Sequence, residues 1–260
     1  MLNMLRAELF RIVRTRIFLA FVVCFCLFAL ATPIALLLYR VWPAFAETGF
    51  VEVPDGPLPT LRLYGTSFVA GSFLSMGASV MMAAFVTEDF KSGFVKNLAQ
   101  ARHGRTAYAA AAVGCGVLVS LAATAVGMLL VEAALRAQGC ELAPCALGET
   151  LQWFLQTALC TAAYASIAVF VTVLIGNETA SVLVALLFGG GAVESVLRIA
   201  LANVPGVPVG VRDCLDGYLA VDLASLSAGA VTDPLTYVQA VVTVGVAAVL
   251  AVAVMRRKSL

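Results

Sequence analysis

Six long apolar stretches account for most of this chain of 260 residues. A helix needs about 20 mostly apolar residues to cross the hydrocarbon core of a bilayer. The six stretches cover residues 17–38, 66–86, 107–131, 153–175, 180–201 and 238–255, and all but the fifth contain no Asp, Glu, Lys or Arg. Because lipid offers no partner for a free backbone N–H or C=O group, each stretch must be helical. The sequence therefore predicts an all-α integral membrane protein, one domain over residues 1–260 with six transmembrane helices.

Composition supports this class. Hydrophobic residues make up 62% of the chain and charged residues only 12%, whereas a typical soluble domain is about 25% charged. The net charge of +1 gives no reason to expect a nucleic-acid partner. Membrane lipids are the first expected partner.

The placement of positive charge predicts the orientation. Eleven of the sixteen basic residues lie in three segments: residues 1–16, the loop 87–106 and the C-terminal tail. These residues are Arg6, Arg11, Arg14, Arg16, Lys91, Lys96, Arg102, Arg105, Arg256, Arg257 and Lys258. An even number of predicted spans separates the three segments, so they lie on the same side of the membrane. Basic residues stay on the cytoplasmic side of a membrane protein. Both termini and the loop 87–106 are therefore expected in the cytoplasm, with the protein in the cell (plasma) membrane as a multi-pass chain.

Residues 2–16 can form an amphipathic helix before the first span. Its apolar residues fall on one face and its charged residues on another; the apolar set is Leu2, Leu5, Leu9, Ile12 and Val13, and the charged set is Glu8, Arg11 and Arg14. Such a helix can lie in the membrane interface with its arginines near anionic headgroups. The alternative is a plain basic anchor for the first span.

Small residues predict where helices approach closely. The second span carries four of them at intervals of four, namely Gly71, Ser75, Ser79 and Ala83, and such a ridge favours tight packing within the chain or across a dimer. The fifth span contains Gly189, Gly190 and Gly191, which suit either close helix contact or a bend. The segment 202–237 is expected to form an external hairpin of short helices.

Few residues outside the loops can carry chemistry. Glu194 and Arg198, four apart in the fifth span, either line a polar path or neutralise each other, with Arg198 reaching outward. Cys140 and Cys145 could close a small disulfide loop in an oxidising compartment. The single histidine, His103, leaves no metal pattern, and no phosphate-binding loop of the P-loop type occurs. We expect no metal, no cofactor and no catalytic residue in this chain.

The loop after the second span contains an acidic start followed by aromatic residues. Phe90, Phe94 and Leu98 are four apart, so one helix would place them on one face. That face could insert into a groove of a soluble partner, or it could lie under the headgroups with its aromatic rings in lipid.

These features together resemble a known family. The basic amphipathic start, the six spans and the loop Glu88-Asp-Phe-Lys-Ser-Gly-Phe-Val-Lys-Asn97 are similar to the ABC-2 type transporter permeases, and within them to the lantibiotic-immunity permeases. The segments Arg105–Tyr108 and Asn177–Ala180 also resemble that family. One position departs from the pattern, because Ala111 stands where a lysine is common.

The resemblance implies a function for the loop. It would be the coupling helix that docks on a cytosolic ABC ATPase subunit, through Glu88, Asp89, Phe90, Lys91, Gly93, Phe94, Lys96, Asn97 and Leu98. ATP and Mg²⁺ would then bind in that ATPase, and a second permease copy or a similar permease would complete the exporter. The expected substrate is an amphipathic, antibiotic-like peptide that leaves from the bilayer. A non-transporting scaffold or sensor subunit that docks a cytosolic partner would explain the same loop.

Overall fold

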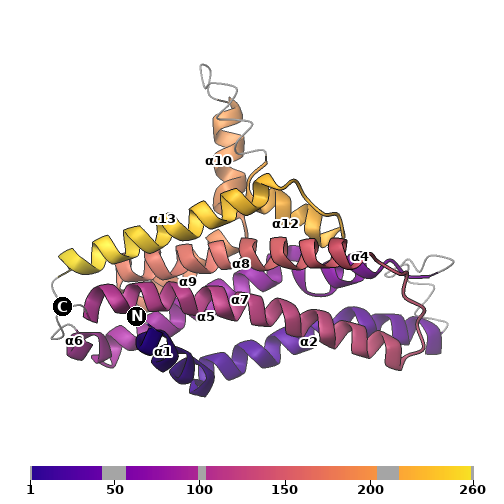
Figure 1. Cartoon of the computed structure of the whole chain (residues 1–260), viewed down its shortest axis with the longest axis horizontal. Coiled ribbons are helices and arrows are strands. Elements are labelled where there is room, and N and C mark those ends of the chain that lie inside the picture. The colour runs from indigo at the N-terminus through magenta and orange to yellow at the C-terminus, as the bar shows by residue number, and fades with distance from the viewer. Residues whose placement is uncertain (1, 43–56, 99–103, 204–216, 259–260) are drawn as a thin grey trace.

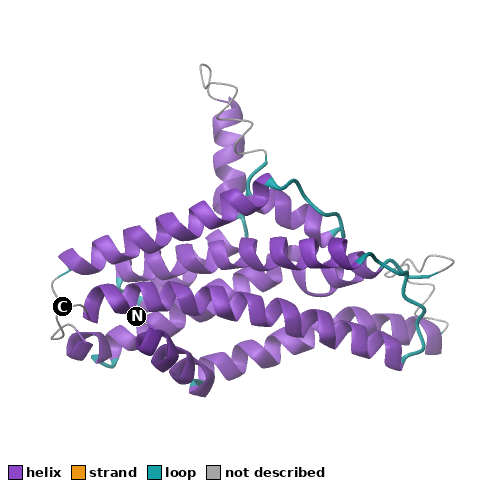
Figure 2. Cartoon of the chain, viewed as in Figure 1, coloured by secondary structure: helices purple, strands orange, loops and turns teal. Residues whose placement is uncertain are grey.

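The computed structural model describes residues 2–42, 57–98, 104–203 and 217–258. The predicted Arg102 and His103 and part of the external hairpin, 204–216, lie outside the described residues. The described elements are helical (Figures 1 and 2). They are α1 (Leu2–Arg14), α2 (Arg16–Val41), α4 (Thr60–Tyr64), α5 (Phe73–Lys91), α6 (Phe94–Leu98), α7 (Gly104–Ala137), α8 (Leu147–Ile175), α9 (Glu178–Gly189), α10 (Ala192–Asn203), α12 (Leu219–Ser227) and α13 (Leu235–Arg257).

The predicted all-α membrane class is confirmed. Within the described part of the chain, five helical segments are long and apolar enough to cross a membrane: Arg16–Val41, Thr60–Lys91, Gly104–Ala137, Leu147–Ile175 and Leu235–Arg257. A sixth crossing results if α9 and α10 are counted as one bent span. The chain is therefore a multi-pass membrane protein.

The second span is broken in its first half. A π-helical turn, Gly65–Val69, and a 3₁₀ turn, Ala70–Ser72, lie between α4 and α5. Gly71 has φ of +63° and a side chain there would meet no atom within 4 Å. Gly71 thus makes no close packing contact within the described part of the chain: glycine suits this position because the backbone takes the left-handed conformation that side chains disfavour.

The rest of the small-residue ridge packs inside the chain, on α9. Ser75 Oγ donates a hydrogen bond of 2.6 Å to the Gly189 carbonyl, and Ala83 lies in a buried cluster with Ala185 of α9. A Cβ atom on Gly189 would lie 2.9 Å from Met76 Cα. Gly189 therefore allows a backbone-to-backbone approach that any side chain would block.

The fifth span is bent, not straight. The axes of α9 and α10 differ by 63°, and Gly191 at the break has φ of +71°. The two roles that the glycine run suggested, close contact and a bend, thus belong to different glycines. Gly190 has ordinary helical dihedrals, and a Cβ atom there would lie 3.1 Å from the Leu186 carbonyl.

Helix α8 forms the centre of the bundle, where it contacts α5, α7, α9, α12 and α13. Beyond Glu149 in its first turn it carries no charged residue, and it is rich in alanine and other small residues, which lets these neighbours approach. Trp153 near its start is fully buried, and its indole N–H donates to the Leu226 carbonyl of α12 at 3.0 Å. This contact fixes the short helix α12 over the end of the bundle.

The three basic segments lie together at one end of the bundle. Figure 1 shows α1, α6 and the C-terminal end of α13 there, while α4 and the end of α2 lie at the other. We call this the basic end. The charge pattern in the sequence predicted that these segments share a side, and the helix packing brings them together.

Candidate functional site

The candidate site is the basic end, where the predicted coupling segment continues from α5. That segment is not one helix. Helix α5 runs to Lys91, Gly93 has φ of +73°, and α6 starts at Phe94. The prediction that Phe90, Phe94 and Leu98 share one face is therefore wrong for the two phenylalanines, since the turn at Gly93 puts them on different helices. The side chain of Leu98 lies outside the described residues.

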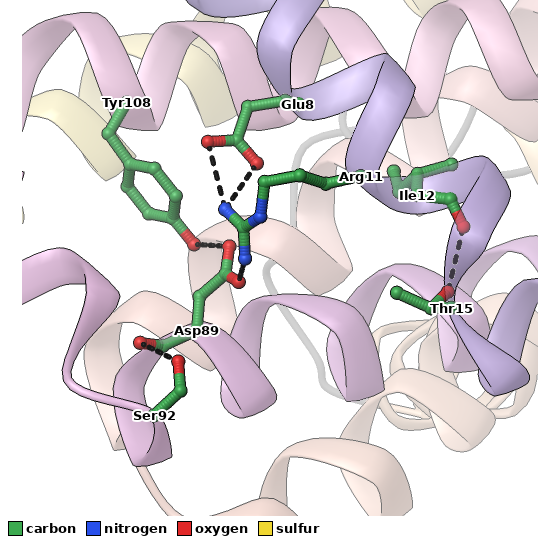
Figure 3. Close-up of polar contacts among 7 residues, drawn as sticks. All are labelled: Glu8, Arg11, Ile12, Thr15, Asp89, Ser92 and Tyr108. Atoms are coloured by element: carbon green, nitrogen blue, oxygen red, sulfur yellow. Dashed lines mark hydrogen bonds and ion pairs between the residues drawn. The ribbon is translucent and has the colours of Figure 1, made fainter.

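Asp89 forms the centre of a buried polar cluster (Figure 3). Its Oδ1 pairs with Arg11 Nη2 of α1, and its Oδ2 accepts a hydrogen bond of 2.9 Å from the Tyr108 hydroxyl of α7. Arg11 Nη1 also donates to both Glu8 oxygens, at 3.1 and 3.3 Å. Both oxygens of each carboxylate are thus used, and the cluster joins α1, α5 and α7.

Phe94 contributes to this cluster from α6. The Arg11 guanidinium carbon lies 3.6 Å from the centre of the Phe94 ring, a cation–π contact, and the ring meets Tyr108 edge-on at 6.5 Å. Phe94 is half-buried. Phe94 therefore packs α6 against the chain's own core and is not a fully exposed side chain for a partner.

Part of the predicted polar face of α1 likewise packs against the chain's own core. Glu8 is fully buried and faces the bundle together with Arg11, whereas Phe10 and Val13 are 59% and 61% exposed. The buried ion cluster outweighs simple amphipathic sorting here, because Arg11 and Tyr108 satisfy the carboxylates that α1 and α5 bring together. Sequence reasoning missed this pairing, although Glu8 lies at helical spacing between Leu5 and Ile12 and so could have been placed on the buried face.

Two further contacts join the end of α5 to other helices. Lys91 Nζ pairs with Glu178 Oε2 of α9 at the surface. Lys258, just beyond α13, donates from Nζ to the Val173 carbonyl of α8 at 2.6 Å and lies 4.8 Å from the centre of the Phe90 ring. The end of α5 thus contacts side chains of α1, α7 and α9 directly, and Lys258 joins it to α8.

The polar residues of the segment are the ones that remain accessible. Glu88, Lys96 and Asn97 are exposed, while Asp89 and Val95 are buried. The segment thus presents a charged surface on a base that the buried cluster makes rigid. Of the eight predicted coupling residues whose burial the structure describes, four are exposed: these three and Lys91, whose side chain pairs with Glu178.

The buried cluster should respond to pH through Glu8. Burial, with a contribution from the Asp89 carboxylate, raises the pKa of Glu8 to about 7 against the opposing effect of Arg11. Between its ordinary pKa of 4.5 and that value, the folded chain holds a proton that the unfolded chain has lost. Stability from this group is therefore complete below pH 4.5 and falls as pH rises to about 7.

We expect the melting temperature of the purified chain to fall between pH 5 and pH 8, and Glu8→Gln to reduce that slope. Scanning fluorimetry in detergent across the range would measure it. Glu88→Gln, at an exposed carboxylate, is the matched control and should keep the wild-type slope. Equal slopes for the wild type and Glu8→Gln would contradict the assignment.

The predicted ionisable pair, Glu194 and Arg198, lies away from the basic end. The two side chains of this described helix form no ion pair with each other. Glu194 Oε2 accepts a hydrogen bond of 2.6 Å from the Tyr164 hydroxyl, and Oε1 accepts from the Ala220 N–H at 3.0 Å. The two residues therefore do not form a direct ion pair, because neutral donors of α8 and α12 occupy both oxygens of Glu194. Arg198 is exposed and lines a pocket of about 240 Å³ with Glu194.

Cys140 and Cys145 are free in the structure, so the predicted disulfide is not formed. The segment between them is held extended by two backbone hydrogen bonds between Leu58 and residues Glu141 and Ala143, which keeps the thiols apart. Cys140 is buried, and Cys145 Sγ lies 3.4 Å from Glu149 Oε2.

Comparison with known proteins adds no family: no family model matches the chain, and no curated protein matches it. The fold and the site define its class, an all-α multi-pass membrane protein with a polar, internally braced surface at its basic end.

Proposed function

We propose that this chain is the membrane-spanning permease subunit of an ATP-binding-cassette exporter, with both termini and the basic end in the cytoplasm of a plasma-membrane protein. The ATPase, with its ATP and Mg²⁺, is a separate subunit, so this chain is not itself an enzyme. A second permease copy completes the pathway, and the substrate is an amphipathic, lantibiotic-like peptide that leaves from the bilayer.

One observation carries the proposal. The segment formed by the end of α5 and α6 combines an exposed polar surface, which includes Glu88, Lys96 and Asn97, with a buried base in which Asp89 contacts α1 and α7. A force applied to that surface would act on α1, α5 and α7 at once, because the ion cluster joins these three helices. Rigid-body shifts of packed helices are the ordinary means of such transmission.

This arrangement changes how the segment would meet an ATPase. Phe90 and Phe94 contact Lys258 and Arg11 of the chain itself, so they brace the surface from behind. The contact with the partner is then made by charged and polar side chains, which set specificity and the rate of association.

The test is to co-express the chain with a candidate ABC ATPase subunit and to reverse the exposed charges with Glu88→Lys and Lys96→Glu. Like charges facing each other should weaken assembly roughly a hundredfold, with loss of co-purification and of ATP turnover. Arg136→Glu, at an exposed residue of α7 near the opposite end, is the control and should assemble normally. Unchanged assembly of the double variant would refute the coupling role.

A second candidate is a non-transporting scaffold or sensor subunit. The favouring observation is that Glu194, the carboxylate expected to line a path, has both oxygens occupied by Tyr164 and Ala220. Such a protein would still dock a cytosolic partner through the basic end. The two functions differ in the assay above, since a scaffold would assemble with the ATPase without conferring substrate-dependent ATP turnover.

A further inference from the structure

Helix α2 is, together with α13, the least enclosed of the five long candidate spans, and an apolar groove lies along each side of α2. It runs along one edge of the bundle in Figure 1, with Leu19 67% and Leu27 66% exposed. Cys26 lines the groove beside α7, and Cys24 lines the groove beside α5. The two grooves are similar in volume, about 440 and 410 Å³, but they differ in what closes them.

The groove beside α7 is closed at its basic end by α1. Its walls include Leu9 and Val13 of α1, Phe18 and Cys26 of α2, and Ala122 and Val126 of α7. The eight residue steps from Phe18 to Cys26 correspond to about 12 Å of helix. This is close to the depth of one leaflet, about 15 Å or half of the hydrocarbon core. The groove therefore matches one acyl chain in chemistry and length.

Three exposed arginines lie within three residues, along the chain, of residues that line the closed end of this groove. Arg6 lies three residues before Leu9, Arg14 follows Val13, and Arg16 starts α2 two residues before Phe18. In the described part of the chain none of the three pairs with a carboxylate, although Arg14 lies over the Phe10 ring at 4.1 Å. Arginine binds phosphate through its planar array of donors. An apolar groove that ends among free guanidinium groups complements an anionic lipid.

We infer that this groove is a binding site for one anionic phospholipid, with an acyl chain between α2 and α7 and the phosphate on Arg14 and Arg16. A second copy of the chain fits the surface less well. A symmetric contact across this face would bring the arginines of both copies towards each other, whereas a phosphate neutralises them. The inference does not depend on the proposed transport function.

The experiment compares lipid retained by the purified full-length chain after exchange into neutral detergent. The probe is vesicle lipid with equal parts of phosphatidylglycerol and phosphatidylcholine, quantified by mass spectrometry. Ala122→Phe fills the groove from an exposed position on α7, and Ala20→Phe fills the opposite groove from an exposed position on α2. The wild type and Ala20→Phe should retain phosphatidylglycerol, and Ala122→Phe should lose most of it.

The paired variant Arg14→Gln and Arg16→Gln tests the headgroup contact. It should keep total lipid but reduce the preference for phosphatidylglycerol about tenfold or more, since each basic residue near an anionic surface contributes measurably. Two results would overturn the inference: equal phosphatidylglycerol in Ala122→Phe and the wild type, or loss of a dimer in Ala122→Phe by light scattering. The second result would assign the groove to a copy of the chain.

Discussion

Replacing Asp89 with alanine is expected to destabilise the purified chain by about 3 kcal/mol, because removal of one partner leaves the others of a buried ion cluster uncompensated. Arg11 would keep only Glu8, and the Tyr108 hydroxyl, fully buried on α7, would lose its acceptor at 2.9 Å. Thermal unfolding in detergent would measure the change. The contact of Arg11 with Phe94 should loosen as well, so α6 should become accessible to protease.

Two other variants show whether the effect comes from the cluster. Glu88→Ala removes the neighbouring carboxylate, which is exposed, and should change stability little. Tyr108→Phe removes one hydrogen bond and should cost about 1 kcal/mol. If Asp89→Ala melts at the wild-type temperature, the buried cluster does not hold α1, α5 and α7 together.

Replacing Gly189 with alanine should destabilise the contact between α5 and α9 by about 2 kcal/mol, the usual effect of overpacking a close contact. The new methyl carbon would lie 2.9 Å from both Met76 Cα and the Ser75 carbonyl oxygen. Backbone atoms cannot move aside as a flexible side chain would. The helices would separate, and the hydrogen bond from Ser75 Oγ to the Gly189 carbonyl would be lost.

Gly245 is the control for this prediction. It lies inside α13, and a methyl group there would meet no atom within 4 Å. Gly245→Ala should leave stability unchanged or raise it by up to about 1 kcal/mol, since alanine favours a helix interior. Opposite signs for the two variants, measured as melting temperatures, are the expected result; equal signs would contradict the close contact at Gly189.

The sequence predicted the spans well but their breaks poorly. Length and apolar composition place α2, α7, α8 and α13 within six residues of their observed bounds, because a lipid-facing helix must be apolar along its whole length. The breaks at Gly71 and Gly191 are different. Glycine permits a left-handed backbone without requiring it, so only packing against neighbouring helices decides where a helix bends.

The candidate site shows the same limit. The sequence identified the segment at the end of α5 by its acidic, aromatic and basic residues. It also correctly placed that segment at the same end of the bundle as α1 and the end of α13. It did not reveal that Asp89, Phe90 and Phe94 face inward. Their partners, Arg11, Tyr108 and Lys258, lie far away in sequence, and no local periodicity records such pairs.

The sequence by itself determined the class of this protein. The chain has six stretches too apolar for water, and most of its basic residues lie in three segments that an even number of stretches separates. This pattern permits a helical bundle in a bilayer and little else, because lipid requires apolar side chains and a backbone that satisfies its own hydrogen bonds. The tertiary structure alone decided which side chains of the basic end are buried and which are free. Burial of a charge depends on a partner that meets it only after the helices have packed.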